Sequence, residues 1–213
     1  MGRRLGVGGE QAPPLAELLN RNYIDGRITS TNIWNLVTSY YDALELPDAG
    51  LMRANTPWSG HYAVMSPVWV VAHTTQFARP GWRYIDAASG RLAGGGSRVA
   101  LHDGARWSVV VETLAATGPQ RLTFALSGGL ARTPVHVWRS DARRWFEEVA
   151  VLRPVAERFA VTVAPGSVYT LTSTTGQHKG VAPTPPPERA FPVPWREDFE
   201  RARFGTTRPT CPT

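Results

Sequence analysis

The stretch "SRVALHDGARWSVVVET", residues 97–113, decides the fold of the larger part of this chain. Two runs rich in β-branched and aromatic residues lie on either side of the turn signal "DGA". Similar runs follow at a spacing of about 8–12 residues, which is typical of strands in antiparallel sandwiches. We therefore predict an antiparallel β-sandwich over residues 82–175.

About eight such runs are enough for two packed sheets. Turn signals separate them, including "GGGS", "SGG" and "APGS". The predicted strands are "WRYIDA", "SRVALHD", "WSVVVET", "RLTFALS", "VHVWRS", "RWFEEVAVL", "RFAVTVA" and "SVYTLTST".

The residues before this region have an α/β character. "TSTNIWNLVTSYYDALELP" (29–47) predicts a helix, because Trp34 and the later apolar residues follow helical spacing and Pro47 stops it. "AGLMRAN" is a strand candidate that leads into the turn "TPWSGHY", and "SPVWVVAHTTQFA" (66–78) begins with a Ser-Pro helix start. Such a unit cannot bury its apolar faces alone. We expect residues 15–81 to be the C-terminal end of a (β/α)₈ TIM barrel, which needs roughly 250 residues. We also expect residues 15–80 to pack poorly without the rest of the barrel.

The two ends of the chain differ from this core in composition. Residues 1–14 are rich in Gly, Pro and Arg, and we expect a disordered leader. Residues 176–213 begin with the proline-dense "GQHKGVAPTPPPERAFPVPW", which is typical of an extended linker, and continue as a short polar tail. The sequence thus predicts a chain that is cut at both ends.

Composition excludes several classes of function. The net charge is +6, but the basic residues are spread along the chain, which argues against a nucleic-acid partner. No run approaches the ~20 apolar residues of a membrane helix, so we expect no stable membrane insertion. The single cysteine, Cys211, excludes an intrachain disulfide and a Cys-based zinc site. We predict no metal and no cofactor.

Four quoted segments together resemble the galactocerebrosidases (galactosylceramidases): "LLNRNYIDGRITSTNIWNLVTSYY", "AGLMRANTPWSGHYAVMSPVWVVAHTTQFARPGWRYI", "GGSRVALHDG" and "VVVETL". The resemblance is dense from about Leu18 to Leu114 and returns at "LTSTTGQHKG". It implies a retaining β-galactosidase acting on galactosylceramide or related glycolipids, built from a TIM barrel, a β-sandwich and a linker. It also implies a secreted or lysosomal location.

Retaining hydrolysis needs two carboxyl groups about 5–5.5 Å apart. The resemblance implies that both catalytic glutamates precede Tyr23, and neither of their motifs is visible in the sequence. Glu10, in the Gly-rich "GVGGEQ", is the one early carboxylate that we consider as a displaced active-site acid. We expect the chain alone to be inactive, with no catalytic residue of its own.

Two tryptophans are candidates for binding the sugar. The resemblance matches Trp34 to a tryptophan of the galactose pocket, although burial on a helix would explain it equally well. Trp58 follows the predicted last barrel strand, where an indole can stack on a sugar or simply pack. His61, His73 and His102 are expected to be structural, because no acid or thiol accompanies them at ligand spacing.

The resemblance also implies an arginine that reaches the galactose from a loop after "VVVETL". This loop is only "AATGPQ" here, and Arg121 beyond it is explained by strand alternation. The short loop leaves two alternatives open. One is a relative that acts on another β-galactoside, and the other is a non-catalytic β-sandwich carbohydrate-interaction module or pseudoenzyme.

Overall fold

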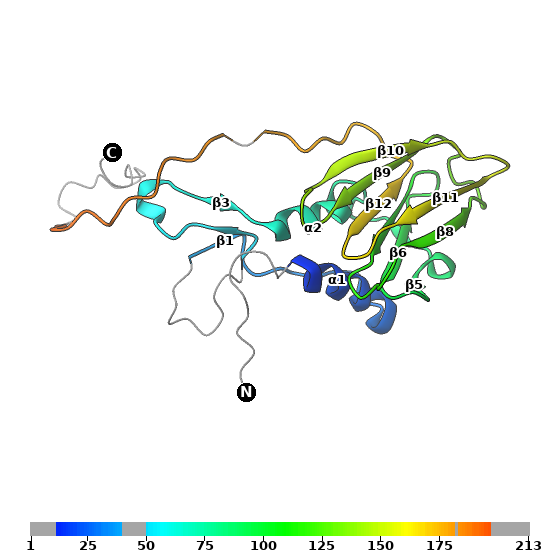
Figure 1. Cartoon of the computed structure of the whole chain (residues 1–213), viewed down its shortest axis with the longest axis horizontal. Helices are drawn as coiled ribbons and strands as arrows, with labels where there is room; N and C mark the ends of the chain where they lie inside the picture. Colours follow the sequence, from blue (N-terminus) through cyan, green and yellow to red (C-terminus); the bar gives the residue numbers. More distant parts are fainter. Residues whose placement is uncertain (1–11, 40–49, 182, 197–213) are drawn as a thin grey trace. The chain divides into compact units, whose positions relative to one another are not determined.

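The computed structural model describes residues 12–39, 50–181 and 183–196. The chain divides into two compact units (Figure 1). Unit 1 comprises Met1–Asn32 and Ser66–Val181, and unit 2 comprises Ile33–Met65 and Ala182–Thr213. The described part is mostly β-sheet with few helices, and the units are taken in turn.

Unit 1 is built on a large antiparallel sheet. Within its described residues seven strands are joined in the order β10-β9-β12-β7-β6-β4, with β5 paired to β6. Two further strands, β8 and β11, form a separate antiparallel pair. The bounds are β4 Arg83–Tyr84, β5 Gly90–Arg91, β6 Ser97–His102, β7 Trp107–Glu112, β8 Gln120–Ala125, β9 Val135–Ser140, β10 Glu147–Leu152, β11 Arg158–Val163 and β12 Val168–Thr172, with a 3₁₀ turn at η2 Asp86–Ala88.

Each predicted β run contains a strand, so the predicted strand positions are confirmed. Strand β7 is buried at every residue because both of its faces are covered. Successive side chains of a strand point to opposite faces. Val109 and Val111 therefore enter a core that includes Phe159 of β11, whereas Val110 faces a second cluster with Ala16 and Val70.

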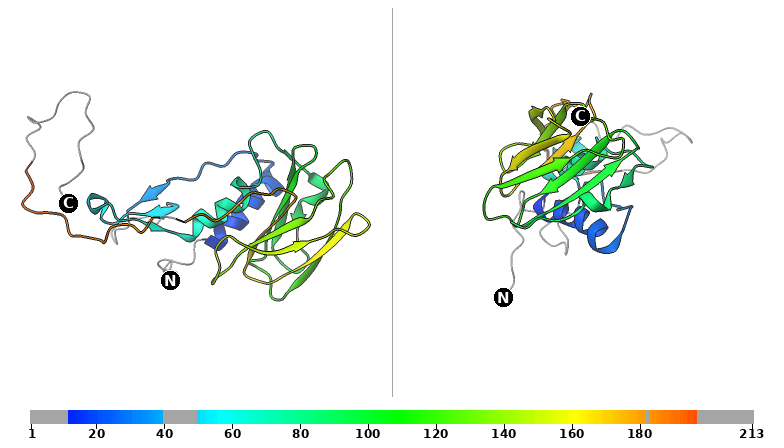
Figure 2. Two further views of the ribbon diagram at one scale, coloured as in Figure 1. Left: turned by 90° about the horizontal axis from the view of Figure 1, so that it is seen from above. Right: turned by 90° about the vertical axis from the view of Figure 1, so that its right-hand side faces the viewer.

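Two helices supply the cover on that second face (Figure 2). Helix α1, Ala12–Gly26, begins within the leader that was predicted to be disordered, and Pro13 and Pro14 occupy its first turn, where a missing backbone N–H is tolerated. Helix α2, Ser66–Thr75, confirms the predicted Ser-Pro start. Its Val70 is only 3% exposed. The expectation that residues 15–80 pack poorly is therefore wrong for both helices, because the sheet supplies an apolar surface.

Unit 2 contains three two-residue strands among its described residues: β1 Val37–Thr38, β2 Met52–Arg53 and β3 Ala63–Val64. Strand β1 is parallel to β2, and β3 is antiparallel to it. Residues 57–59 form the 3₁₀ turn η1, Pro57–Ser59.

The helix predicted over residues 29–47 is wrong in its described part. Residues 29–36 are not helical, and β1 follows them. The β-branched side chains of this stretch, such as Ile33 and Thr38, lose rotamer freedom in a helix and favour extended backbone. The remainder of the predicted helix, including Pro47, lies outside the described residues.

The described residues of the Pro-rich segment, 176–181 and 183–196, contain neither helix nor strand. Cys211 and the polar tail lie outside the described residues. In the part of the chain that the structure describes, no helix is long and apolar enough to cross a membrane. The division into barrel end and sandwich stays a prediction, and unit 1 combines α2 with all the strands of the predicted sandwich.

Candidate functional site

Trp34 lies in unit 2, three residues before β1, at a bend in a stretch that is neither helix nor strand. Its side chain is 83% exposed. The alternative interpretation, in which Trp34 is buried on a helical stripe, is therefore wrong. An indole left in solvent keeps its apolar face free, and such a face is suited to stacking on the C–H side of a sugar ring.

Trp58 belongs to η1 of the same unit and is half-buried. Its indole Nε1–H donates a hydrogen bond to the carbonyl oxygen of Arg189 at 2.8 Å. Its ring meets Phe191 edge-on, with centroids 5.3 Å apart and an interplanar angle of 85°. The polar atom of this side chain is thus already used by the Pro-rich segment.

Two neighbours of Trp58 contact the same segment. His61 Nδ1 lies 2.7 Å from the carbonyl oxygen of Pro186, and Tyr62 donates its hydroxyl to the carbonyl of Pro183 at 3.1 Å. A carbonyl oxygen only accepts, so Nδ1 of His61 carries a proton. Among the residues that the structure describes, no group of three His, Cys, Asp or Glu side chains could hold a metal ion.

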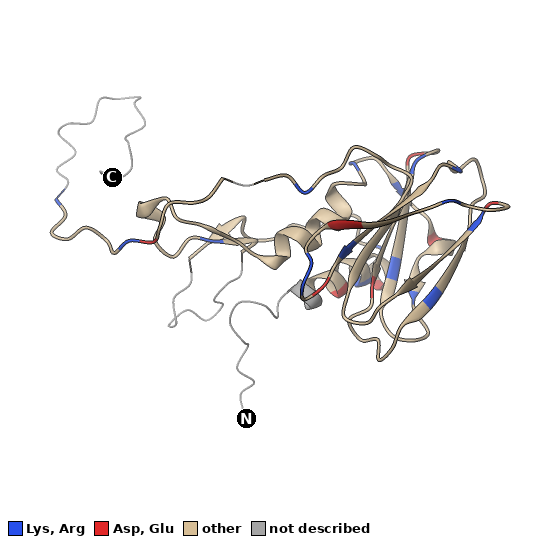
Figure 3. Cartoon of the chain, turned by 45° about the horizontal axis from the view of Figure 1, so that its top comes forward, with Lys and Arg blue, Asp and Glu red and all other residues tan. Residues whose placement is uncertain are grey.

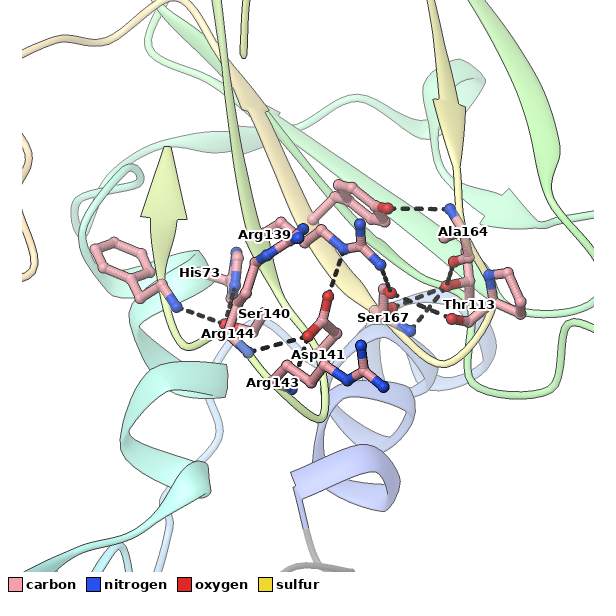
Figure 4. Close-up of polar contacts among 12 residues, drawn as sticks. His73, Thr113, Arg139, Ser140, Asp141, Arg143, Arg144, Ala164 and Ser167 are labelled. Atoms are coloured by element: carbon pink, nitrogen blue, oxygen red, sulfur yellow. Dashed lines mark hydrogen bonds and ion pairs between the residues drawn. The ribbon is translucent and has the colours of Figure 1, made fainter. Parts of the chain in front are cut away.

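His73 lies on α2 in unit 1 and is completely buried (Figure 4). The hydroxyl of Thr170 donates to the carbonyl of His73 at 2.8 Å, so His73 Nδ1 must donate to Thr170 Oγ1 at 2.8 Å. Ser140 Oγ accepts the backbone N–H of Phe146 at 2.9 Å and lies 2.8 Å from Nε2, to which it donates. Every polar atom in this cluster is satisfied when the imidazole is neutral.

Burial lowers the pKa of His73 from 6.5 to about 3, because the charged ring would lose its hydration. This histidine therefore ties α2 to β9 and β12 as a neutral group. His102 is also structural: its Nδ1 accepts the backbone N–H of Gly104 at 3.0 Å in the turn after β6.

A hollow of about 440 Å³ lies at one end of the sheet in unit 1. Figure 4 shows Arg139 beside Asp141, with which it forms an ion pair at 2.9 Å, and beside Ser167, to which it donates at 3.2 Å. Asp141 also accepts the backbone N–H groups of Arg143 and Arg144 at 2.8 and 3.0 Å. With three arginines and one aspartate the lining is net positive and polar. This hollow was not predicted from the sequence, although the arginine-rich run "RSDARR" (139–144) was a signal for it.

Figure 3 shows the positions of Lys, Arg, Asp and Glu spread along the described part of the ribbon, without a continuous basic stripe in the view drawn. Most described carboxylates have a cationic partner, and the hydrogen bonds of the buried Glu112 are with Ser97 at 2.5 Å and the N–H of Leu114 at 3.1 Å. Glu10, which the sequence offered as a displaced active-site acid, lies outside the described residues. The ion pairs with arginine among the described residues are Glu17–Arg21, Asp25–Arg91, Asp86–Arg27, Asp103–Arg106, Asp141–Arg139 and Glu157–Arg132. Glu148 contacts His136 and Glu188 contacts His61, and these contacts are ionic only when the imidazole is protonated.

The short loop after β7 is held against the turn at residues 94–95. Gln120 accepts the N–H of Gly94 at 3.0 Å and donates to the carbonyl of Gly95 at 2.8 Å. Arg121 follows on β8, where it is paired with Thr162 of β11. The loop itself contains no arginine.

The architecture is shared with glycoside hydrolases of known structure. The chain superposes on the catalytic domain of GH30 xylanase C from Talaromyces cellulolyticus with a TM-score of 0.59 at 16% identity, covering 77% of this chain and 35% of the xylanase. A GH30 endoxylanase from Clostridium papyrosolvens gives 0.58 at 15% identity, with 77% and 38% coverage. At this identity the likeness concerns the fold alone.

Residues 6–76 match the model of glycosyl hydrolase family 59. The chain is 38% identical to mouse (Mus musculus) galactocerebrosidase over 207 residues and 39% identical to the human (Homo sapiens) protein over 205 residues. These matches cover 86% and 85% of this chain and 30% of each relative. The chain is thus similar in sequence to the galactocerebrosidases, in agreement with the resemblance, and spans about 30% of the length of these relatives.

Proposed function

We propose that this chain is part of a glycosidase of the galactosylceramidase type, which cleaves the galactosyl bond of galactosylceramide or a related glycolipid. The observation that carries the proposal is the collinear similarity to galactocerebrosidases over most of the chain. In this proposal the barrel end and the β-sandwich frame the sugar pocket. The two catalytic glutamates come from residues outside this chain, and no cofactor takes part.

The exposed indole of Trp34 supports a role in binding the sugar. An apolar ring that is 83% exposed is poorly explained by packing within unit 2. Trp58 is the second proposed contact, through its ring only, because its N–H is bonded to Arg189.

The loop after β7 favours a second candidate, a relative that acts on another β-galactoside. Gln120 holds this loop against residues 94–95, and no arginine is present there to reach a galactose. The two candidates share the sugar ring and differ in what surrounds it. A panel of β-galactosides with different aglycones separates them.

The test is sugar binding by ligand-observed NMR with methyl β-galactoside. Trp34→Ala is expected to remove most of the saturation transfer, because it deletes the exposed ring that is proposed to stack on the C–H face of the sugar. Leu36→Ala is the matched control, since Leu36 is 63% exposed in the same segment and lacks a ring. Equal binding by the parent chain and Trp34→Ala contradicts the assignment.

A further inference from the structure

The Pro-rich segment meets the turn at Trp58 through backbone carbonyls at a fixed interval. Tyr62 donates to Pro183, His61 to Pro186 and Trp58 to Arg189, at 3.1, 2.7 and 2.8 Å. The three acceptors are each three residues apart. The donors run along the chain in the opposite direction, so the two segments are antiparallel.

An interval of three residues is the repeat of a polyproline II helix, which has no internal hydrogen bonds and leaves its carbonyls free. The sequence "PTPPPER", residues 183–189, favours this conformation. Proline fixes its own φ and disfavours helical backbone in the residue before it. Carbonyls 183, 186 and 189 then share one face, about 9 Å apart.

The turn also supplies two aromatic side chains, Trp58 and Tyr62, that contact the Pro-rich segment. Phe191 packs edge-on against Trp58 and lies 6.1 Å from Trp195 between ring centroids. Gly60 has φ +76°, and a Cβ at this position would lie 3.5 Å from Pro186 Cγ, so the Pro-rich segment passes directly over the turn. Polyproline II segments dock in aromatic-lined grooves, and here the aromatic side chains of Trp58 and Tyr62 also donate hydrogen bonds to the segment.

We propose that residues 58–62 form a docking surface for a polyproline II segment, and that residues 183–191 of the same chain are its resident ligand. The segment that composition describes as a linker is then a fixed part of unit 2. It holds the indole of Trp58 in one orientation. This inference does not depend on the glycosidase proposal, because docking is measured without sugar.

Trypsin cleavage of the bond between Arg189 and Ala190 reports docking, because the carbonyl of Arg189 is the acceptor for Trp58. Cleavage requires the undocked segment, and its rate follows the undocked population when docking is fast. Removing one neutral hydrogen bond weakens docking by about two- to tenfold. We expect Tyr62→Phe and Trp58→Phe each to accelerate this cleavage by that factor, measured by mass spectrometry.

Two controls separate undocking from unfolding. Tyr84→Phe removes a hydroxyl from unit 1 and is expected to leave cleavage after Arg189 unchanged. Cleavage between Arg143 and Arg144, in the loop after β9, is expected to be the same in all variants. Unaltered cleavage after Arg189 in both Tyr62→Phe and Trp58→Phe overturns the proposal.

A peptide tests the same surface without any substitution in the protein. The peptide "PTPPPEQAFP" reproduces residues 183–192 with Gln in place of Arg189, so trypsin leaves it intact while every carbonyl is kept. In excess it is expected to displace the resident segment and accelerate cleavage after Arg189. A scrambled peptide of the same composition is expected to have no effect. Equal effects of the two peptides contradict polyproline recognition.

Discussion

His73→Gln is the substitution that most directly tests the buried contact between α2 and the sheet. The folded protein holds the imidazole neutral, with a pKa of about 3, whereas the unfolded chain has the ordinary value of 6.5. Between these values the unfolded state binds one more proton than the folded state. The contribution of the neutral His73 imidazole to the free energy of unfolding is therefore complete above pH 6.5 and is lost as the pH falls toward 3.

The size of this loss follows from the two pKa values. Each pH unit in the window costs about 1.4 kcal/mol, so lowering the pH from 7.5 to 5 removes about 2 kcal/mol of unfolding free energy. Any folded pKa below about 4 gives nearly the same loss at pH 5, because the folded imidazole is then still neutral. A domain stability of about 5–15 kcal/mol makes this change easily measurable.

The measurement is urea unfolding followed by circular dichroism at several pH values between 7.5 and 5. At pH 7.5 His73→Gln is expected to be less stable by about 1–3 kcal/mol, because hydroxyls of Thr170 and Ser140 lose a buried partner. At pH 5 the gap is expected to close by about 2 kcal/mol, since glutamine does not titrate.

His178→Gln is the matched control, because His178 is an exposed histidine of unit 1. It is expected to keep the pH dependence of the parent chain. Carboxylates that titrate near pH 5 contribute equally to all three proteins and cancel in the differences. If the parent and His73→Gln lose stability in parallel from pH 7.5 to 5, the buried neutral imidazole is refuted.

Three further outcomes are expected. Gly96→Ala is predicted to lower the free energy of unfolding by about 3 kcal/mol or more, because φ is +99° and the new Cβ would lie 2.2 Å from a backbone oxygen. The control Gly104→Ala, at φ +113° with nothing within 4 Å, is predicted to lower it by about 1–2 kcal/mol. Equal losses in thermal or urea unfolding would contradict the clash at Gly96. Leu171→Ala is predicted to lower the free energy of unfolding by about 2–5 kcal/mol, because Leu171 is 0% exposed. Val151, at 53% exposed, is the control, and Val151→Ala should change this free energy by no more than about 0.5 kcal/mol. A similar loss for both substitutions would refute the assignment of Leu171 to the core. The chain alone is predicted to show no turnover of a chromogenic β-galactoside above a Glu10→Gln control, because retaining hydrolysis needs two carboxyls; activity abolished by Glu10→Gln would make Glu10 catalytic.

The strand positions of unit 1 could be predicted because their signal is local. Runs such as "RFAVTVA" carry β-branched residues and end at glycine or proline turns, and both properties are readable within about ten residues. The order of the strands could not be read in this way. Strand β12 lies between β7 and β9, and these pairings join residues far apart in the sequence.

The helix predicted over residues 29–47 failed because two signals competed there. Apolar spacing favoured a helix, whereas the β-branched side chains favoured extended backbone, and tertiary pairing of β1 with β2 decided for the strand. The packing of α1 and α2 was missed for a related reason. Their apolar faces were assigned to absent barrel strands, although the second face of the sheet was equally apolar at Val110 and Val168.

The two tryptophans illustrate what sequence reasoning leaves unresolved at the candidate site. Trp34 was a sugar-binding candidate from the resemblance and Trp58 from its position after the predicted last barrel strand, and packing was the alternative for both. The structure separates them: Trp34 has an exposed ring, whereas Trp58 gives its N–H to Arg189 and one ring edge to Phe191. A sugar hydroxyl could accept a hydrogen bond from the N–H of Trp58 only by displacing the carbonyl of Arg189. One hydrogen bond would replace another, with little net gain in binding free energy. Trp58 is therefore suited to contact a sugar by stacking of its ring, and the orientation of this ring depends on the Pro-rich segment remaining docked.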